Sequence, residues 1–257
     1  MELPKNRFKA ALREGRLQIG LWSTLSSGFA ADVLSDIGYD WLVLDAEHSP
    51  TELSDTLHQL MALARVPETA AVVRPPWNDP VMLKRYLDIG TQNFLIPMVN
   101  SEAEARAAVA ACRYPPQGIR GVAVAIRANR FGRVKDYLHH ANEEICVIVQ
   151  VETREAIRNL EAIASVEGVD GVFIGPSDLS AAYGKLGGNR DPEMQVVIEE
   201  ARKVIARCGK ASGILTGVEE DAQRYIRDGF VFVAVGNDLA ILARQAEALR
   251  RRFPETR

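Results

Sequence analysis

Two short apolar runs, separated by a segment of helix length, constrain the fold of this chain more than any other feature. Residues 145–149 (ICVIV) and 171–174 (GVFI) are continuously apolar, as expected for strands buried on both faces of a parallel sheet. Between them, residues 153–166 carry apolar side chains at helical spacing. We therefore predict a βαβ unit, which requires a parallel sheet with its functional residues at the carboxyl ends of the strands.

The same alternation of strand and helix patterns continues along the whole chain. The expected strands cover residues 18–22, 40–44, 70–73, 93–99, 145–149, 171–174, 211–215 and 230–235. Short turns, many with glycine, join them to helices, so we predict one closed (β/α)8 barrel formed by residues 1–257 as a single domain. A doubly wound open sheet is the alternative. Residues 1–16 are expected to add a short surface helix before the barrel.

Composition excludes several classes of protein. With 47% hydrophobic and 25% charged residues, neither a disordered chain nor a coiled coil is indicated. A net charge of -3 gives no basic surface for nucleic acid or an anionic membrane, and no apolar run approaches a membrane span of roughly 20 residues. The N-terminus lacks the apolar core of a signal peptide. Cys112, Cys146 and Cys208 are few and far apart, which argues against disulfides and for a cytoplasmic location.

An acid follows each strand of the βαβ unit. Glu152 follows the first strand, two residues after Gln150, and Asp178 follows the second, next to Ser177. Two carboxylates at the same edge of neighbouring strands suit a divalent cation such as Mg²⁺ or Mn²⁺, with waters and substrate oxygens as the other ligands. The alternative is structural, because each acid could equally stabilise the first turn of a helix.

Two further strand ends carry candidate catalytic groups. His48 follows Asp45 by three residues, and an imidazole oriented by a carboxylate is a competent general base near neutral pH. The alternative is a loop histidine bonded to backbone. Arg74 ends an otherwise apolar strand, so its charge either faces the site, where it would stabilise a developing oxyanion, or forms a salt bridge to Glu47 or Asp45.

A metal, an arginine and a His–Asp base together describe formation of an enolate from a chelated 2-oxo acid. A Schiff-base mechanism would instead need a lysine in the barrel mouth. No lysine falls at the carboxyl end of an expected strand, and Lys185, in the loop after the sixth strand, is the one that could approach. The metal route is therefore favoured.

Six ordered segments resemble the HpcH/HpaI family of class II pyruvate aldolases, over about residues 8–253. They read LVLDAEHSP, VVRPPWNDP, LDIGTQNFLIPMV, RYPPQGIRG, VQVETREA and GVDGVFIGPSDLSAAYG. Some relatives carry glycine where Ala46 stands and alanine where Ser177 stands, and neither difference removes a proposed ligand.

The resemblance implies a role for each site residue. Glu152 and Asp178 would bind a divalent metal ion (Mg²⁺, Mn²⁺ or Co²⁺). Arg74 would stabilise the transition state and His48 would accept a proton. Asp88 of the LDIG segment would raise the basicity of His48, a role that reasoning from the residues gave to Asp45. The substrate-binding residues would be Gln150, Gly175, Ser177 and Asp178. Apart from the resemblance, we expect substrate specificity to depend on Trp22, Leu215 and the arginine-bearing loop 113–133.

The implied reaction is reversible cleavage of 4-hydroxy-2-oxo acids, among them 4-hydroxy-2-oxoheptanedioate, to pyruvate and an aldehyde, as in the catabolism of aromatic compounds. Within the same family, a 2-keto-3-deoxy-sugar-acid aldolase, an oxaloacetate decarboxylase or a citryl-type lyase remain alternatives. A catalytically inactive barrel that serves as a scaffold is the alternative from another class. The resemblance also implies a trimer or hexamer, with the last helix packed on a neighbouring subunit.

Overall fold

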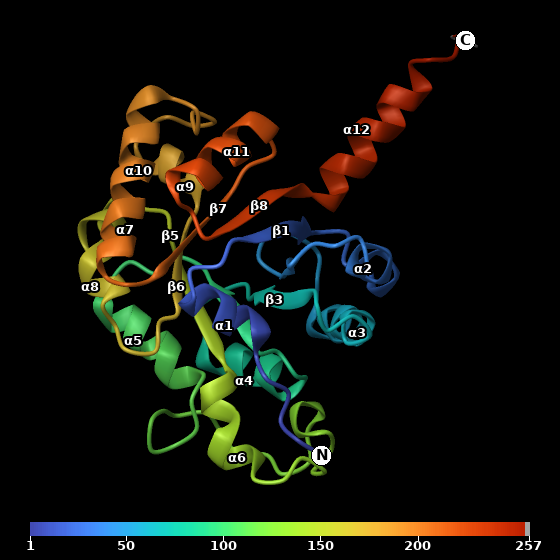
Figure 1. Cartoon of the computed structure of the whole chain (residues 1–257), viewed down its shortest axis with the longest axis vertical. Helices are drawn as coiled ribbons and strands as arrows, with labels where there is room; N and C mark the ends of the chain where they lie inside the picture. Colours follow the sequence, from blue (N-terminus) through green and yellow to red (C-terminus); the bar gives the residue numbers. More distant parts are fainter. Residues whose placement is uncertain (255–257) are drawn as a thin grey trace.

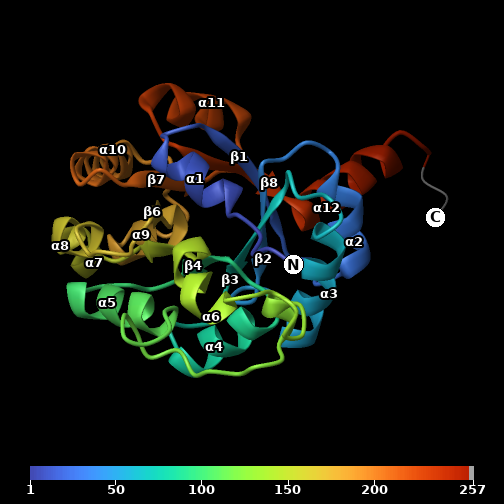
Figure 2. The ribbon, with the colours of Figure 1, turned by 60° about the horizontal axis from the view of Figure 1, so that its bottom comes forward.

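Eight parallel strands close into a barrel in which each strand pairs with the next along the chain and β8 pairs back to β1 (Figures 1 and 2). The computed structural model describes residues 1–254. The strands are β1 (Gln18–Ser23), β2 (Trp41–Asp45), β3 (Ala70–Arg74), β4 (Asn93–Ile96), β5 (Cys146–Val151), β6 (Gly171–Ile174), β7 (Ala211–Leu215) and β8 (Phe232–Asn237). The predicted (β/α)8 barrel is thus confirmed, and the open sheet is excluded.

Helices form a ring around the strands, as the view along the barrel in Figure 2 shows. They are α1 (Arg7–Arg13), α2 (Gly28–Ser35), α3 (Leu53–Leu63), α4 (Pro80–Asp88), α5 (Glu102–Ala111), α6 (Tyr137–His140), α7 (Arg154–Arg158), α8 (Leu160–Ala164), α9 (Pro176–Ala182), α10 (Pro192–Arg207), α11 (Glu219–Asp228) and α12 (Asp238–Arg250), with 3-10 turns η1 (Arg127–Asn129) and η2 (Ala141–Glu144). Within residues 1–254, none of these helices has the length and apolar character that crossing a membrane requires.

Aromatic rings fill the barrel interior. Trp22 lies 5.4 Å from Phe173 between ring centroids, and Trp41 lies 5.8 Å from Phe232. Glycines on the strands make room for them, because a Cβ atom at Gly213 would lie 2.0 Å from the Phe232 ring. The interior is therefore a packed core, and ligands have access to its ends only.

Helix α1 closes the amino end of the barrel instead of lying on the surface, so the expected surface helix was wrong. Phe8 and Leu12 are 2% and 3% exposed and belong to the same cluster as the interior rings. The buried Lys9 ammonium donates to the carbonyl of Ile145 at 2.6 Å and lies 3.6 Å from Asp170. Burial lowers the pKa of Lys9, with Asp170 opposing that shift. The many charged residues of this segment led to the prediction of a surface helix, but Phe8 and Leu12 give the helix an apolar face that is buried.

The expected helix over residues 153–166 is divided into α7 and α8 at Asn159. Its backbone leaves helical geometry at φ -97° and ψ 7°, and its side-chain amide donates to the carbonyl of Asn100 at 2.7 Å. The preceding strand β5 runs two residues further than expected, through Val151. Gln150 consequently lies inside a strand, opposite Phe173 of β6.

The arginine-bearing loop 113–133 lies at the amino end of the barrel. Arg127 donates to the carbonyls of Ile89 at 2.6 Å and Leu60 at 3.2 Å, near the carboxyl termini of α4 and α3. With the N-terminal segment, the loop borders a cavity of about 920 Å³. Within one chain, the side chains that anchor this loop are therefore remote from the carboxyl ends of the strands.

Candidate active site

The carboxyl ends of β2, β3, β5 and β6 bring together the predicted acids and the predicted arginine. Asp45 and Arg74 end neighbouring strands and are paired directly in register. Glu152 follows β5 immediately, and Asp178 lies in the first turn of α9, directly after β6. The topology thus collects these side chains at one mouth of the barrel, as the strand assignments predicted.

Arg74 is held on three sides by buried groups. Its Nε and Nη2 donate to the two carboxylate oxygens of Asp45 at 2.8 and 2.6 Å, and its Nη1 lies 2.8 Å from Oε2 of Glu47. The guanidinium carbon lies 5.2 Å from the ring centroid of Trp22. Burial acts to lower the pKa of Arg74, but Asp45 and Glu47 outweigh it, so the net shift is upward. Two of the five N–H donors of the guanidinium are left for another acceptor.

Asp45 is occupied by Arg74 and does not orient the imidazole of His48. Besides its two bonds to the guanidinium, its carboxylate accepts from the backbone N–H of Glu47 at 3.0 Å and of His48 at 3.4 Å. The His48 side chain is 64% exposed, and its Nε2 lies 3.9 Å from Oε2 of Glu47. A bidentate, charge-assisted pair with arginine explains why Asp45 turns away from the histidine.

Asp88 lies far from His48 within one chain. It is the last residue of α4 and pairs with the buried Arg120 at 3.0 Å. It also borders the cavity at the amino end, together with Asp40 and Gln92, which directly precede β2 and β4. The two residues that the resemblance implies as partners therefore lie at opposite ends of the barrel.

Glu152 is fixed by its neighbours from two directions. It is 2% exposed, and it accepts from the backbone N–H of Met98 at 3.0 Å and from Nε2 of Gln150 at 2.6 Å. A Cβ atom at Gly175 would lie 2.4 Å from Oε2 of Glu152, so glycine is required where the chain passes the carboxylate. Burial raises the pKa of Glu152 to about 7, against the hydrogen bonds from Met98 and Gln150.

The side chains around Glu152 carry oxygen atoms, the kind of ligand that a hard divalent cation prefers. Asp178 is exposed in α9, whose N-cap is Gly175, and it acts on Glu152 electrostatically by raising its pKa. Oε1 of Gln150 is buried without a hydrogen-bond partner. Within the described residues 1–254, no group of three or more His, Cys, Asp or Glu side chains is placed to hold a metal. The chain thus offers two carboxylates, and an ion would need further oxygen ligands from water or substrate.

Glu47 is the functional candidate that reasoning from sequence missed, having considered it only as a salt-bridge partner. Its side chain is 13% exposed, and burial raises its pKa to about 7, opposed by Arg74 and reinforced by Asp45 and Asp178. Glu47 lies between the candidate catalytic residues Asp45 and His48 in the segment DAEH, and this position was the one indication in the sequence that it belongs to the site. The sequence could not reveal that its carboxylate turns inward.

The remaining predicted residues lie at the same mouth. Trp22 is 3% exposed beneath Arg74, and its Nε1 has no hydrogen-bond partner. Leu215 ends β7 and is half-buried, whereas Ser177 is exposed in the first turn of α9. Trp22 is thus the buried member of this set, whereas Leu215 and Ser177 lie nearer the solvent.

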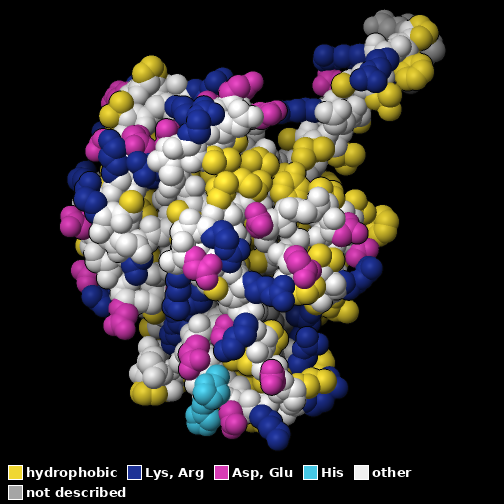
Figure 3. Space-filling model, viewed as in Figure 1, with side chains coloured by type: hydrophobic (Ala, Val, Ile, Leu, Met, Phe, Trp, Pro, Cys, Tyr) yellow, Lys and Arg dark blue, Asp and Glu magenta, His cyan; other side chains and the backbone are white. Residues whose placement is uncertain are grey.

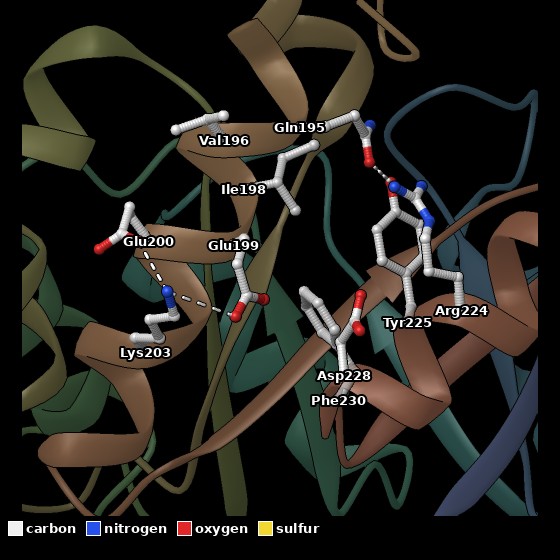
Figure 4. Close-up of a pocket in the computed structure, with 10 residues that line it drawn as sticks. All are labelled: Gln195, Val196, Ile198, Glu199, Glu200, Lys203, Arg224, Tyr225, Asp228 and Phe230. Atoms are coloured by element: carbon white, nitrogen blue, oxygen red, sulfur yellow. Dashed lines mark hydrogen bonds and ion pairs between the residues drawn. The ribbon is translucent and has the colours of Figure 1, made fainter. Parts of the chain in front are cut away.

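A separate groove of about 390 Å³ lies on the outer ring, between α10 and α11 (Figure 4). Tyr225 and Phe230 form its apolar part, and the Tyr225 hydroxyl donates to Gln195 at 3.1 Å. Lys203 is paired with Glu200 at 2.8 Å across its edge. None of the predicted site residues borders this groove.

Comparison with known proteins gives a consistent family assignment. The sequence model described as HpcH/HpaI aldolase/citrate lyase matches residues 18–245. The 4-hydroxy-2-oxo-heptane-1,7-dioate aldolases of Shigella sonnei and Escherichia coli are each 55% identical over 250 residues, covering 97% of this chain and 95% of the relative.

Solved structures give the same result. An HpcH/HpaI aldolase/citrate lyase family protein from Burkholderia cenocepacia superimposes with a TM-score of 0.94 at 36% identity, covering 96% of this chain and 99% of that chain. The HpcH/HpaI aldolase from Desulfitobacterium hafniense superimposes with a TM-score of 0.88 at 26% identity, covering 97% and 98%.

Proposed function

The chain belongs to the HpcH/HpaI aldolase/citrate lyase family, and from this premise we propose that it is a metal-dependent aldolase that reversibly cleaves 4-hydroxy-2-oxo acids to pyruvate and an aldehyde. The proposed substrate is 4-hydroxy-2-oxo-heptane-1,7-dioate, after which the 55% identical relatives are named. The single observation that carries the proposal is the arrangement of Glu152, Gln150 and Asp178 beside the buried, doubly paired Arg74.

Glu152 and Asp178 are the residues that would hold the divalent cation. Such an ion supplies Lewis acidity to a 2-oxo acid that binds through its carboxylate and keto oxygens. The preference for oxygen ligands suits Mg²⁺, Mn²⁺ or Co²⁺. The unpartnered Oε1 of Gln150 would face the same ligands and orient them.

The protein side chains would handle charge and protons in the cleavage step. The C3–C4 bond breaks, its electron pair moves toward the keto oxygen to form an enolate, and the C4 hydroxyl becomes the aldehyde carbonyl. The free N–H groups of Arg74 would stabilise the enolate oxygen, and Asp45 fixes the direction of the guanidinium. His48 would accept the hydroxyl proton and return it to C3.

An oligomer is part of the proposal. Figure 3 shows hydrophobic side chains at the base of α12 and along it, and Leu239, Leu242 and Leu249 are 51%, 57% and 55% exposed. A second copy of the chain in a trimer or hexamer would cover this helix, and light scattering would report the mass. Subunit contact is also the route by which Asp88 could reach His48.

We place the protein in the cytoplasm, where its three free cysteines would remain reduced.

Product analysis tests the proposed reaction. Purified enzyme with Mn²⁺ is given 4-hydroxy-2-oxo-heptane-1,7-dioate, a 2-keto-3-deoxy-sugar acid or oxaloacetate in parallel, and pyruvate and aldehyde are measured separately. We expect equal amounts of pyruvate and aldehyde from the heptanedioate, at the highest kcat/KM. Pyruvate from oxaloacetate alone would identify a decarboxylase and overturn the aldolase assignment. Asp178→Asn, which removes a proposed metal ligand, serves as the inactive control.

A further inference from the structure

We propose that Arg154 holds helix α9 in place and thereby sets the position of Asp178 relative to Glu152 before a divalent ion binds. The inference deepens the metal site of the proposed function and rests on it. Arg154 is the first residue of α7, two residues after Glu152, whereas Asp178 lies in the first turn of α9. Arg154 would be a positioning residue, because it would act through α9 and not by contact with the ion.

The two acids belong to different segments of the chain, and only one of them is held by hydrogen bonds of its own carboxylate. Glu152 is buried and accepts from Met98 and Gln150. Asp178 is exposed, so its position follows that of α9, a helix of seven residues. The two carboxylates repel each other, as the upward action of Asp178 on the pKa of Glu152 shows. Without an ion, this repulsion favours an α9 that lies further from Glu152.

The start and the middle of α9 are attached to the barrel. The backbone N–H of Gly175, the N-cap of α9, donates to the carbonyl of Val151 at 3.1 Å. In the middle of the helix, Leu179 and Ser180 are fully buried, and Leu179 belongs to the main hydrophobic cluster. The last residue, Ala182, is exposed. The carboxyl end of α9 is therefore the part that needs a further attachment.

Arg154 provides a contact at this end. Its Nε donates to the carbonyl of Ala182 at 2.9 Å, and its guanidinium carbon lies 4.5 Å from the ring centroid of Tyr183, the C-cap of α9. Figures 1 and 2 show α7 and α9 next to each other. The last carbonyls of a helix lack partners within the helix and attract a cation, and the ring adds a cation–π contact. Arg154 thus joins the segment that carries Glu152 to the helix that carries Asp178.

The positive charge of Arg154 would by itself oppose the binding of a cation. If the residue acted through its charge alone, its removal would strengthen ion binding, because one repulsive group would be gone. If it holds α9, its removal weakens ion binding, because the ion must then also order the helix that carries Asp178. The two explanations predict changes of opposite sign, so one binding measurement separates them.

The variant Arg154→Met tests the proposal through Mn²⁺ binding, measured by calorimetry without substrate. We expect the dissociation constant to rise roughly 3- to 20-fold, on the scale of one hydrogen bond and one exposed cation–π contact. Arg154→Lys, which can still donate and contact the ring, should recover part of the affinity. Arg158→Met removes the same charge from the exposed last residue of α7 and is the matched control. This control should bind Mn²⁺ as tightly as the wild type or more tightly.

A second variant, Tyr183→Leu, separates the contact with α9 from a local effect on α7. It leaves Arg154 in place and removes the ring, so Mn²⁺ binding should weaken in the same direction but by less. Combined with Arg154→Met, it should add no further loss, because the ring then has no guanidinium to contact. At saturating Mn²⁺, turnover by Arg154→Met should return close to that of the wild type.

Unchanged or tighter Mn²⁺ binding by folded Arg154→Met would overturn the proposal, as would independent, multiplicative losses in the double variant. Should Arg154→Met fail to fold, Tyr183→Leu alone decides, and wild-type affinity in that variant would overturn the proposal. A wild-type enzyme that binds Mn²⁺ but cleaves no hydroxy acid would refute the proposed reaction and leave this inference standing. A wild-type enzyme that binds no divalent ion would refute both.

Discussion

Arg74 illustrates how one side chain can be structural and catalytic at once. Its guanidinium forms a fork with Asp45, contacts Glu47 and lies over Trp22. A lysine could reproduce the charge at this place but not the fork, because an ammonium group has no planar pair of donors. The pairing pre-orders the remaining N–H groups so that they point in a fixed direction before substrate arrives.

Replacing Arg74 by lysine should therefore reduce the rate of turnover even though the positive charge is kept. We expect Arg74→Lys to lower kcat about 10²-fold, on the scale of removing one oxyanion donor. Steady-state kinetics with the same conservative change at Arg106, whose side chain is 62% exposed on α5, provides the control. A variant with wild-type kcat would show that Arg74 serves the structure alone.

At this scale the sequence predicted which residues meet, and it left open which of them pair; the alternative in which Arg74 forms salt bridges to Asp45 and Glu47 is the one the structure shows. Glu152, Asp178 and Arg74 were placed correctly because strand ends of a parallel barrel share one edge. The sequence left two partners open for Asp45: His48, three residues further along the chain, and Arg74, at the end of the neighbouring strand. The choice depends on side-chain directions that spacing does not encode.

Helix α1 shows how a short element can complete a core. Phe8, Ala11 and Leu12 occupy one face of two turns, and all three are 3% exposed or less. The sequence contained this spacing, but seven residues give too weak a periodic signal to separate a plug from a surface helix. Burial was decided by the open amino end of the barrel, which only the closed fold creates.

Truncation of Phe8 should destabilise the protein without altering its chemistry. Because Phe8→Ala removes a ring packed against Trp41 and Phe232, we expect a loss of about 3–5 kcal/mol in the free energy of unfolding. The kcat of the folded fraction at 25 °C should stay within about twofold of the wild type. Denaturant unfolding measures the first quantity, and Leu186→Ala, at a side chain 90% exposed, should change neither.

The whole molecule gains a pH dependence from its buried acids. Glu47 and Glu152 have pKa values raised from 4.5 to about 7, chiefly by burial, so the native state holds protons that the unfolded chain has released. Stability from these groups is therefore present below about pH 4.5 and is lost as the pH rises toward about 7. A cation bound at the site would reverse the effect by favouring the charged forms.

Thermal unfolding of Glu152→Gln should reveal this linkage. Without metal, we expect the variant to gain stability relative to wild type between pH 5 and 7.5, by at most about 3 kcal/mol. With saturating Mn²⁺ the wild type should become the more stable protein. The exposed Glu155→Gln on α7 is the control, and a difference between Glu152→Gln and wild type that does not vary with pH would contradict the assigned shift.

The most direct test of the account is turnover of 4-hydroxy-2-oxo-heptane-1,7-dioate by chelator-treated enzyme during stepwise return of Mn²⁺. The account predicts that activity is lost on chelation and returns with one ion per chain, and that Glu152→Gln and Asp178→Asn do not recover. Full activity in the chelated enzyme would contradict it.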